Sequence, residues 1–288
     1  MIDAVWSAGA LLGEGPVWDD RRGLLYFLDI KANRLFEYDP TRDGRRILDL
    51  PSQISAITFR ERNGMVAAGG HGFAFLDPAT GALDPITEVE AALPENRFND
   101  GKCDGRGRFL AGSMDDRERR PSGSVYLLEA GRPARRLFGG FVVCNGPAFS
   151  PDGRTLYIAD SAGRTILAFD YSPATGDAGD PRPFVRFTDA DGYPDGLTVD
   201  AKGFLWCAHW DGWKISRFAP TGEHDRSIGL PVPRPTSLTF GGPDLRDLYV
   251  TSARIGLSDD QLRAAPLSGS LFRLGTDVAG LPAARFAG

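Results

Sequence analysis

The chain of 288 residues has a formal net charge of −5 and an isoelectric point near 5.3. This acidic balance argues against nucleic acid or an anionic membrane as a partner. No run of about 18 apolar residues occurs, so we expect no membrane-spanning segment. Apolar residues make up 42% of the chain, enough at this length for a buried core that needs no disulfide or metal to hold it.

The cysteines and histidines indicate a reduced protein without a zinc site built from His and Cys ligands. Cys103, Cys144 and Cys207 are odd in number and far apart in sequence, so we expect free thiols and a cytoplasmic location. The N-terminal stretch carries Asp3 and no basic segment, so no signal peptide is expected. The three histidines lack metal-type spacing, and any bound metal would therefore use oxygen ligands.

Short β-type segments alternate with turn signals along the whole chain. The first unit reads EGPVW, a polar turn DDRRG, a second apolar strand LLYFLDI and a third strand RLFEYDP. A more polar fourth strand follows, and the layout then repeats. The six units open at Glu14 (EGPVW), Ser55 (SAITF), Asp100 (DGKCD), Asn145 (NGPAF), Asp195 (DGLTV) and Thr236 (TSLTF).

Four antiparallel strands in a unit of about 40–50 residues are typical of a β-propeller blade. The sequence therefore predicts an all-β fold, a six-bladed β-propeller with four antiparallel strands per blade, in a single domain over residues 1–288. A β-sandwich would not explain six units in register, and a β-helix needs shorter coils. We expect Asp3–Ala8 to add the outer strand of the last blade and so to close the ring.

The tripeptide PDG occurs at Pro151–Gly153 and again at Pro194–Gly196, and in isolation both copies predict tight turns. Their places in the repeat differ. Asp152 falls between the first and second strands of its unit, whereas Asp195 falls where an inner strand begins, on the opposite face of the disc. A strand of about 15 Å separates these faces at about 3.3 Å per residue. We expect Asp152 to be a turn residue and Asp195 to point toward the central axis.

The six residues that open the units are all polar, and three of them are acids. Carboxylates crowded near one axis repel each other unless a cation or a proton neutralises them. Acids, an amide and nearby waters suit a hard cation. The alternative is that polar residues only hydrate a wet channel and shape the strand entries. The same register places Glu14, Asn145 and Asp195 at one end of the channel.

The loops on the same face as Asp195 would form the rim of a site. Arg97 and Asn99 lie just before the inner strand of the third unit and would suit a ligand with many hydroxyl groups, although an arginine can equally form a surface ion pair. Trp210 and Trp213 could stack on a sugar or pack between blades. The loop 253–269 is expected to hold a short helix capped by Ser258.

Five motifs, in order and at matching spacing, carry a family resemblance: GEGPVW, RFNDGKCDGRGRFLAGSM, NGPAFSPDGRTLYIADS, YPDGLTVDAKGFLWCAHWDG and FGGPDLRDLYVTSAR. Together they resemble the senescence-marker-protein/gluconolactonase/luciferin-regenerating family, which includes regucalcin and bacterial sugar-acid lactonases. The resemblance spans nearly the full chain. It implies a six-bladed propeller that binds one divalent cation and hydrolyses aldonolactones.

The resemblance also implies roles for individual residues. The metal ligands of the family match Glu14 in EGP, Asn145 in NGP and Asp195 in PDG, and Asp195 also matches the general base. Whether Asp195 itself or a water activated by the cation is the effective base stays open. Arg97 and Asn99 match residues that contact substrate.

One substrate contact of the family has no one-to-one match in this chain. It is a glutamate on the loop of the third blade, where this sequence reads MDDRERR, so Asp116 or Glu118 would take its place. The expected partner is a small sugar lactone, and the protein is expected to be a monomer or a weak homo-oligomer.

The cation and the function remain open between several candidates. Ca²⁺, Zn²⁺, Mn²⁺ and Fe²⁺ all accept such ligands. Other functions to weigh are an arylesterase or phosphotriesterase activity, a calcium-binding regulator and an interaction propeller. The acidic axial positions argue against the last of these, because a scaffold needs no acids there.

Overall fold

Apolar runs in the sequence become strands that are buried on both faces. The computed structural model describes residues 2–288, and in it every residue of β3 (Leu24–Asp29) and β11 (Phe109–Asp115) is buried. The outer strand β5 (Gly44–Asp49) instead alternates between half-buried and exposed positions. This gradient arises because each sheet is covered by a neighbouring sheet on either side and meets solvent only at its outer edge.

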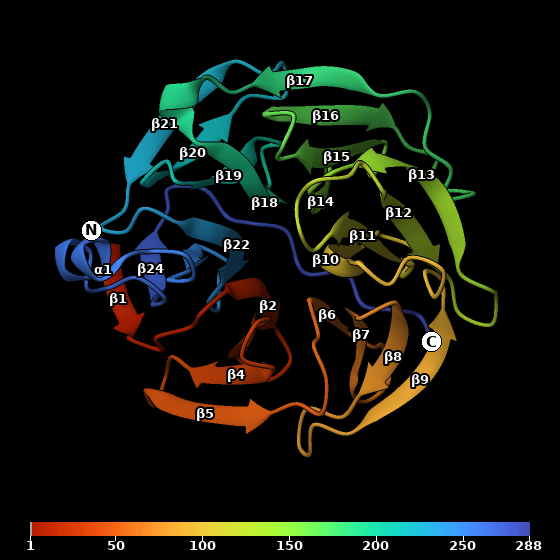
Figure 1. Ribbon diagram of the computed structural model, residues 1–288, viewed down its shortest axis with the longest axis horizontal. Coiled ribbons are helices and arrows are strands. Elements are labelled where there is room, and N and C mark those ends of the chain that lie inside the picture. Colours follow the sequence, from red (N-terminus) through yellow and green to blue (C-terminus); the bar gives the residue numbers. More distant parts are fainter. Residues whose placement is uncertain (1) are drawn as a thin grey trace.

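Six antiparallel sheets of four strands each surround a central axis, as the sequence predicts (Figure 1). Blade 1 holds β2 (Gly13–Asp19), β3, β4 (Arg34–Asp39) and β5; blade 2 holds β6 (Ala56–Phe59), β7 (Met65–Gly69), β8 (Gly72–Leu76) and β9 (Leu83–Glu88). Blade 3 holds β10 (Asn96–Cys103), β11, β12 (Gly123–Leu128) and β13 (Arg135–Phe141); blade 4 holds β14 (Cys144–Phe149), β15 (Thr155–Asp160), β16 (Thr165–Asp170) and β17 (Arg182–Arg186). Blade 5 holds β18 (Tyr193–Val199), β19 (Leu205–Trp210), β20 (Lys214–Phe218) and β21 (His224–Gly229); blade 6 holds β22 (Pro235–Gly241), β23 (Asp247–Ser252), β24 (Leu271–Gly275) and β1 (Ile2–Trp6).

The N-terminal strand closes the ring. β1 pairs antiparallel with β24, so the last blade contains the first and the last strands of the chain. This confirms the expected outer strand, which covers Ile2–Trp6 instead of Asp3–Ala8. Such closure completes the last blade with four strands like the other five, and leaves each sheet only short edges.

The C-terminal segment, residues 279–288, crosses one face of the ring from blade 6 toward blades 2 and 3 (dark blue in Figure 1). Gly280 forms a β-bridge with Asp200 of blade 5, and Phe286 forms one with Arg60 of blade 2. Between them, the half-buried Arg285 donates to Asp19 of blade 1 at 2.7 Å. The sequence repeat does not predict this segment, because it lies outside the six units.

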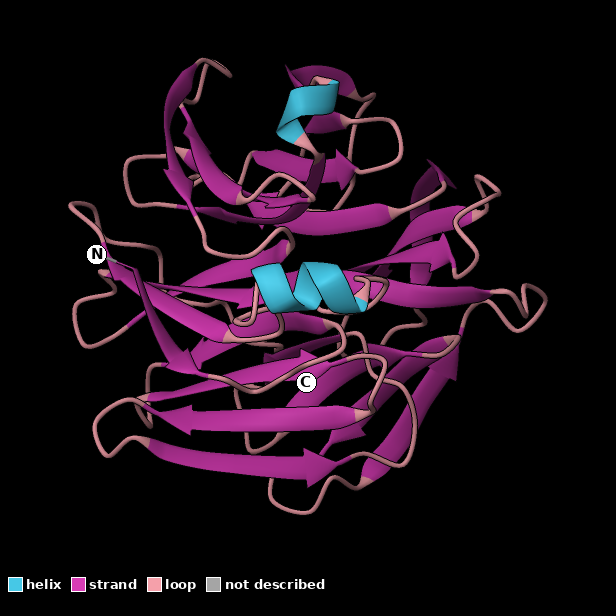
Figure 2. Cartoon of the chain, turned by 60° about the vertical axis from the view of Figure 1, so that its left-hand side comes forward, coloured by secondary structure: helices cyan, strands magenta, loops and turns pink. Residues whose placement is uncertain are grey.

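Among residues 2–288, helical structure is confined to two short pieces, visible in cyan in Figure 2. They are a 3₁₀ helix at Asp189–Asp191 and α1 at Asp259–Ala264. The side chain of Ser258 accepts a hydrogen bond from Gln261 N, which confirms the expected cap of α1. Within residues 2–288 no helix is long and apolar enough to span a membrane.

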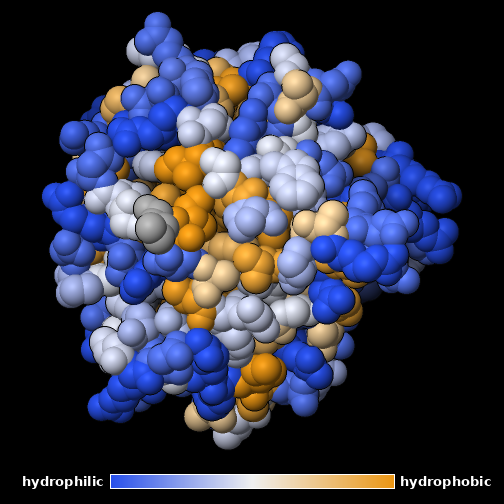
Figure 3. All heavy atoms as spheres, turned by 90° about the vertical axis from the view of Figure 1, so that its left-hand side faces the viewer, coloured by the Kyte–Doolittle hydropathy of each residue, from blue (hydrophilic) through white to orange (hydrophobic). Residues whose placement is uncertain are grey.

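The surface of the last blade is more apolar than the surface around it. In Figure 3, apolar side chains gather over the blade formed by β22–β24 and β1, and hydrophilic side chains surround them.

The three cysteines are all buried and free, as the sequence predicts. Burial raises the pKa of the Cys103 and Cys207 thiols far above the usual range, so these thiols are unreactive at neutral pH.

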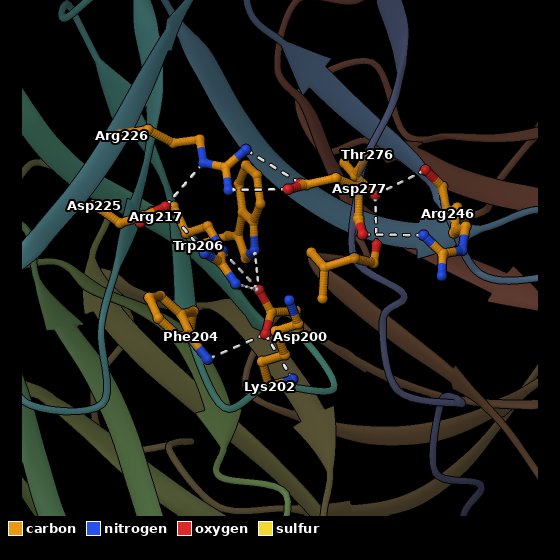
Figure 4. A network of polar contacts seen from close by, with 11 residues as sticks. Asp200, Lys202, Phe204, Trp206, Arg217, Asp225, Arg226, Arg246, Thr276 and Asp277 are labelled. Atoms are coloured by element: carbon orange, nitrogen blue, oxygen red, sulfur yellow. Dashed lines mark hydrogen bonds and ion pairs between the residues drawn. The ribbon is translucent and has the colours of Figure 1, made fainter.

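A buried ion pair stabilises blade 5 (Figure 4). The Asp200 carboxylate is fully buried and accepts hydrogen bonds from Trp206 Nε1 at 2.9 Å and from Arg217 Nε at 2.8 Å. It also accepts from the backbone amides of Lys202 and Phe204, which shapes the turn between β18 and β19. Removing one member of such a pair leaves the other charge buried without full compensation.

We expect Asp200→Asn to lower the free energy of unfolding by about 3 kcal/mol, because the Arg217 guanidinium loses its buried counter-charge. The matched control is Asp277→Asn, which removes an exposed ion pair with Arg226 in the same network and should leave stability close to that of the wild type. Urea denaturation followed by tryptophan fluorescence measures both. Equal effects of the two substitutions would contradict this assignment.

Candidate functional site

A cavity of about 490 Å³ opens at the end of the channel where the inner strands begin. Glu14 of β2, Asn145 of β14 and Asp195 of β18 all line it, each from the inner strand of a different blade. Their side chains are about as buried as the core, at 4–5% exposed. The cavity is also lined by Leu12, Arg97, Asn99, Met114, Glu118, Val142, Val143, Ser161, Ala162, Tyr193, Trp210 and Asp211.

Glycine follows each of these three residues because of backbone conformation or close packing of the inner strands: Gly15 has a positive φ of 53°. A Cβ atom on Gly146 would lie 2.7 Å from the backbone nitrogen of Leu197, and one on Gly196 would lie 2.2 Å from Ser237 Oγ. Gly146 also has a positive φ of 40°, which disfavours other residue types. The motifs EGP, NGP and PDG are therefore packing requirements of the channel wall as well as carriers of polar side chains.

The carboxyl groups at this end of the channel are electrostatically strained. Burial, and then the charge of Asp100, raise the pKa of Glu14 to about 8. Burial raises the pKa of Asp195 well above its usual range, and the charges of Glu14, Asp100 and Glu118 raise it further. Both shifts favour the protonated form of the acids, and a bound cation would counteract them.

The residues present fit a hard cation. Glu14 receives a hydrogen bond from its neighbouring amide Gly15 N, at 3.0 Å to Oε2, and from no other group among residues 2–288. Two carboxylates and the carboxamide of Asn145 supply only oxygen donors, the type that divalent hard cations prefer. No cluster of three His, Cys, Asp or Glu side chains with metal-binding geometry occurs in the described part of the chain, so the carboxamide would be an essential third donor.

Three of the six residues predicted at this mouth do not line the cavity: Ser55, Asp100 and Thr236. Asp100 lines a second cavity of about 600 Å³ that opens toward the other end of the channel, although its charge is near enough to raise the pKa of Glu14 and Asp195. A β-bulge between Phe98 and Asp100 shifts the register of β10 by one residue. Asn99 consequently faces the candidate site, and its Nδ2 donates to Asn145 Oδ1 at 2.6 Å. Ser55 and Thr236 are fully buried but do not line the cavity.

The two PDG aspartates lie at the two ends of the channel, as the repeat predicts. Asp152 lines the opposite cavity together with Gly153, in the turn between β14 and β15. Its carboxylate accepts from Ser150 Oγ at 2.6 Å and from Arg154 N at 3.0 Å, the pattern of a turn residue. Asp195 lines the candidate site instead.

Arg97 is held in place by an ion-pair network that joins blades 1 and 3. Its Nε donates to Asp116 Oδ1 at 2.5 Å, and Lys31 Nζ donates to the same oxygen at 2.7 Å. Partial burial opposes ionisation of Asp116, but the bonds from Lys31 and Arg97 prevail and lower its pKa. Asp116 does not line the cavity, so its carboxylate positions Arg97 instead of facing a ligand.

Glu118 is the acid of that loop that does line the cavity. It is exposed and has a positive φ of 54°, a conformation that non-glycine residues seldom adopt without compensation. Its amide donates to the carbonyl of Asp115 at 2.8 Å, which stabilises this turn. Of the two acids left open by the sequence, only Glu118 is placed to contact a bound molecule.

The structure also distinguishes the two tryptophans, because only one of them lines the cavity. Trp210 lines the cavity, and the Arg234 guanidinium lies 4.6 Å from its ring centroid, so one ring face is already covered. Trp213 is 46% exposed and does not line the cavity. The sequence therefore identified the relevant loop but could not choose between its two aromatic residues.

Ser161 is a cavity residue that the sequence reading missed. A signal for it exists in the repeat. The motifs RFLAGSM, TLYIADS and FLWCAHW end at Met114, Ser161 and Trp210, and all three residues line the cavity. The position that ends the second strand of a blade therefore supplies the cavity wall, as the position that opens the first strand does.

Comparison with known proteins agrees with this geometry. The model of the SMP-30/Gluconolactonase/LRE-like region matches residues 12–254, which include the strands that line the cavity. The chain belongs to this family. It is 38% identical over 281 residues to an L-arabinolactonase of Azospirillum brasilense, covering 96% of this chain and 92% of the relative.

The family also contains proteins named for calcium. This chain is 34% identical over 294 residues to a regucalcin of Xenopus laevis, covering 100% of this chain and 98% of the relative. The crystal structure of a calcium-binding regucalcin from Agrobacterium tumefaciens superimposes with a TM-score of 0.94 at 31% identity, over 98% of this chain and 96% of that one. The family resemblance and the six-bladed fold are thereby confirmed.

We expect Asp195→Asn to stabilise the metal-free protein, and to do so more at pH 8 than at pH 5. The pKa of Asp195 is raised in the folded state, so folding binds a proton that the unfolded chain releases. The free energy of unfolding of the wild type therefore falls as pH rises from about 4, the usual carboxyl range, through the folded pKa. The neutral asparagine avoids this loss.

Urea denaturation in the presence of EDTA measures this difference, with Asp152→Asn as the matched control. Asp152 is exposed and its pKa is lowered by hydrogen bonds in its turn, so its substitution should not stabilise the protein at either pH. A wild-type protein as stable as Asp195→Asn at pH 8 would contradict the electrostatic strain described above.

Proposed function

We propose that this protein hydrolyses the lactone of a sugar acid to the open-chain acid, with the help of one divalent cation. The observation that carries the proposal is the convergence of Glu14, Asn145 and Asp195 from three blades in one cavity, with both acids strained by burial and mutual repulsion. The family supports it, since a relative that is 38% identical is named an L-arabinolactonase.

Glu14, Asn145 and Asp195 would hold the cation through their side-chain oxygens. When bound, the cation would supply Lewis-acid stabilisation for the negative charge that develops on the lactone carbonyl oxygen. Its charge would also offset the repulsion between Glu14 and Asp195, and so keep both acids ionised at neutral pH.

Asp195 would act as the base. As a water oxygen bonds to the carbonyl carbon, the carboxylate accepts a proton from that water. When the bond between the carbonyl carbon and the ring oxygen breaks, the ring oxygen takes the proton and becomes a hydroxyl group. The products are balanced: one water is consumed, one ester bond is broken, and one carboxylic acid and one alcohol are formed.

Arg97, Asn99 and Glu118 would orient the sugar. Arg97 is 6% exposed, and its Nη2 group has no partner among residues 2–288, so it is free to donate to a hydroxyl or ring oxygen. Glu118 also lines the cavity, and its negatively charged carboxylate can accept hydrogen bonds from sugar hydroxyls. A substrate held by a donor and an acceptor keeps its carbonyl in one orientation, which lowers the entropic part of the barrier.

A calcium-binding regulator is the second candidate. Relatives named regucalcin cover the full length of this chain at 34% identity, and the solved Agrobacterium tumefaciens relative is described as a calcium-binding protein. Such a role would use the same three oxygen ligands without turnover. The two functions therefore differ in what a lactone assay shows and agree in what a cation titration shows.

The deciding experiment is hydrolysis of a panel of aldonolactones, followed by proton release, with and without EDTA and with Ca²⁺, Zn²⁺, Mn²⁺ or Fe²⁺ added back. We expect turnover of at least one five- or six-carbon aldonolactone, its loss on chelation and its recovery with a cation. Cation binding without turnover of any lactone would favour the regulator. Turnover of paraoxon or an aryl ester in preference to all lactones would indicate the other hydrolase class.

The two PDG aspartates provide a matched pair of variants. Asp195→Asn keeps the size and removes the basicity, so we expect lactone turnover to fall by about 10²–10⁴-fold. Asp152→Asn makes the same chemical change in the turn at the opposite end of the channel, and activity should stay within about threefold of wild type, because asparagine suits such turns equally well. Similar losses in both variants would show that the site is misplaced.

A further inference from the structure

A directional row of hydrogen bonds runs along the cavity wall from blade 3 to blade 5. Arg97 Nη1 donates to Asn99 Oδ1 at 2.7 Å, and Asn99 Nδ2 donates to Asn145 Oδ1 at 2.6 Å. Asn145 Nδ2 then donates to Ser161 Oγ at 3.0 Å. Ser161 Oγ in turn donates to the backbone carbonyl of Pro194 at 2.6 Å.

The two ends of this row fix the direction of every bond in it. A backbone carbonyl can only accept, so the Ser161 hydroxyl must point its proton at Pro194 and accept from the carboxamide beside it. A guanidinium can only donate, so Asn99 must present its oxygen to Arg97 and its NH₂ group to the next residue. Both ends require the same orientation of Asn145, with its NH₂ group toward Ser161 and its oxygen away from it.

Ser161 lies where two proposed cation ligands meet. It follows β15 in blade 4, is 7% exposed, and is fixed by its own backbone amide, which donates to the Val143 carbonyl at 3.2 Å. Its hydroxyl bonds the Asn145 side chain of blade 4 and the Pro194 carbonyl of blade 5, the residue directly before Asp195. One side-chain oxygen thus connects the inner strands of neighbouring blades.

We propose that Ser161 is a positioning residue of the cation site, which fixes the orientation of the Asn145 carboxamide and its placement relative to Asp195. This inference rests on the proposed function, since it concerns the same three ligands. Without the hydroxyl, Asn145 Nδ2 loses its protein acceptor and the Pro194 carbonyl loses its donor. Only the bond from Asn99 Nδ2 then orients the carboxamide, so its oxygen is held less firmly in the direction that suits a cation.

The test compares cation affinity in Ser161→Ala, Ser161→Thr and Ser150→Ala by isothermal titration of metal-free protein with Ca²⁺ and, separately, with Mn²⁺. Loss of an outer-shell partner typically weakens metal binding by about 10–100-fold, and we expect this for Ser161→Ala. Ser161→Thr restores the hydroxyl and should recover most of the affinity. Ser150→Ala removes a hydrogen-bonded hydroxyl of the same blade at the opposite end of the channel and should leave affinity unchanged.

A double-mutant cycle with Asn145→Ala separates positioning from general damage. If Ser161 acts through Asn145, the double variant should bind the cation about as weakly as Asn145→Ala alone, whereas independent effects would multiply. Circular dichroism verifies the fold. If Ser161→Ala fails to fold, Ser161→Cys takes its place, since a thiol is a weak donor and acceptor and should also weaken binding.

The outcomes distinguish this inference from the proposed function. Wild-type protein that binds neither cation overturns this inference, whereas lactone turnover with and without EDTA decides the proposed function separately. Wild-type binding that stays within about twofold in folded Ser161→Ala overturns only the role of Ser161. Losses that multiply in the cycle overturn it as well, because they would show that Ser161 does not act through Asn145.

Discussion

The candidate site depends on the closure of the ring. Pairing of β1 with β24 joins the first and last strands of the chain, so that the inner strands of six blades share one axis. Only this closure brings together Glu14, Asn145 and Asp195, which belong to blades 1, 4 and 5. The approach of the inner strands is so close that a Cβ atom at Gly146 or Gly196 would collide with the next blade.

Closure also crowds buried carboxyl groups together, which raises their pKa values. Buried carboxyl groups near one axis have raised pKa values, because water is excluded and like charges face each other. Deeper in the channel, the charge of the buried Lys102, which donates to the Leu197 carbonyl at 2.7 Å, partly opposes the rise in the pKa of Asp100. Glu14 and Asp195 have no hydrogen bond or ion pair with a lysine or arginine among residues 2–288.

Family membership alone does not assign the chemistry. Relatives at similar identity are named as a lactonase and as regucalcins, and they share this architecture. The groups around Glu14, Asn145 and Asp195 are therefore where the chemistry has to be tested. They include Arg97, held by Asp116 and Lys31, together with Glu118 and Trp210 on the rim.

The sequence by itself determined the repeat and hence the fold. Apolar strands and turn signals at a regular spacing are local features, so six blades, the strand contributed by the N-terminus, the cap at Ser258 and the different ends reached by Asp152 and Asp195 could all be predicted. The register of the inner strands in blades 1, 4 and 5 was also predictable, because the polar residue that opens each of them lines the cavity.

Only the tertiary structure decided the features that depend on register slips and on contacts between blades. The bulge in β10 turns Asn99 into the site and Asp100 away from it, and a one-residue slip leaves no clear mark in a sequence that reads FND. The choice of Glu118 over Asp116 depends on Lys31, which lies in another blade. The C-terminal segment and the bonds of Ser161 likewise join residues far apart in sequence, since their partners are set by how the blades pack and not by local pattern.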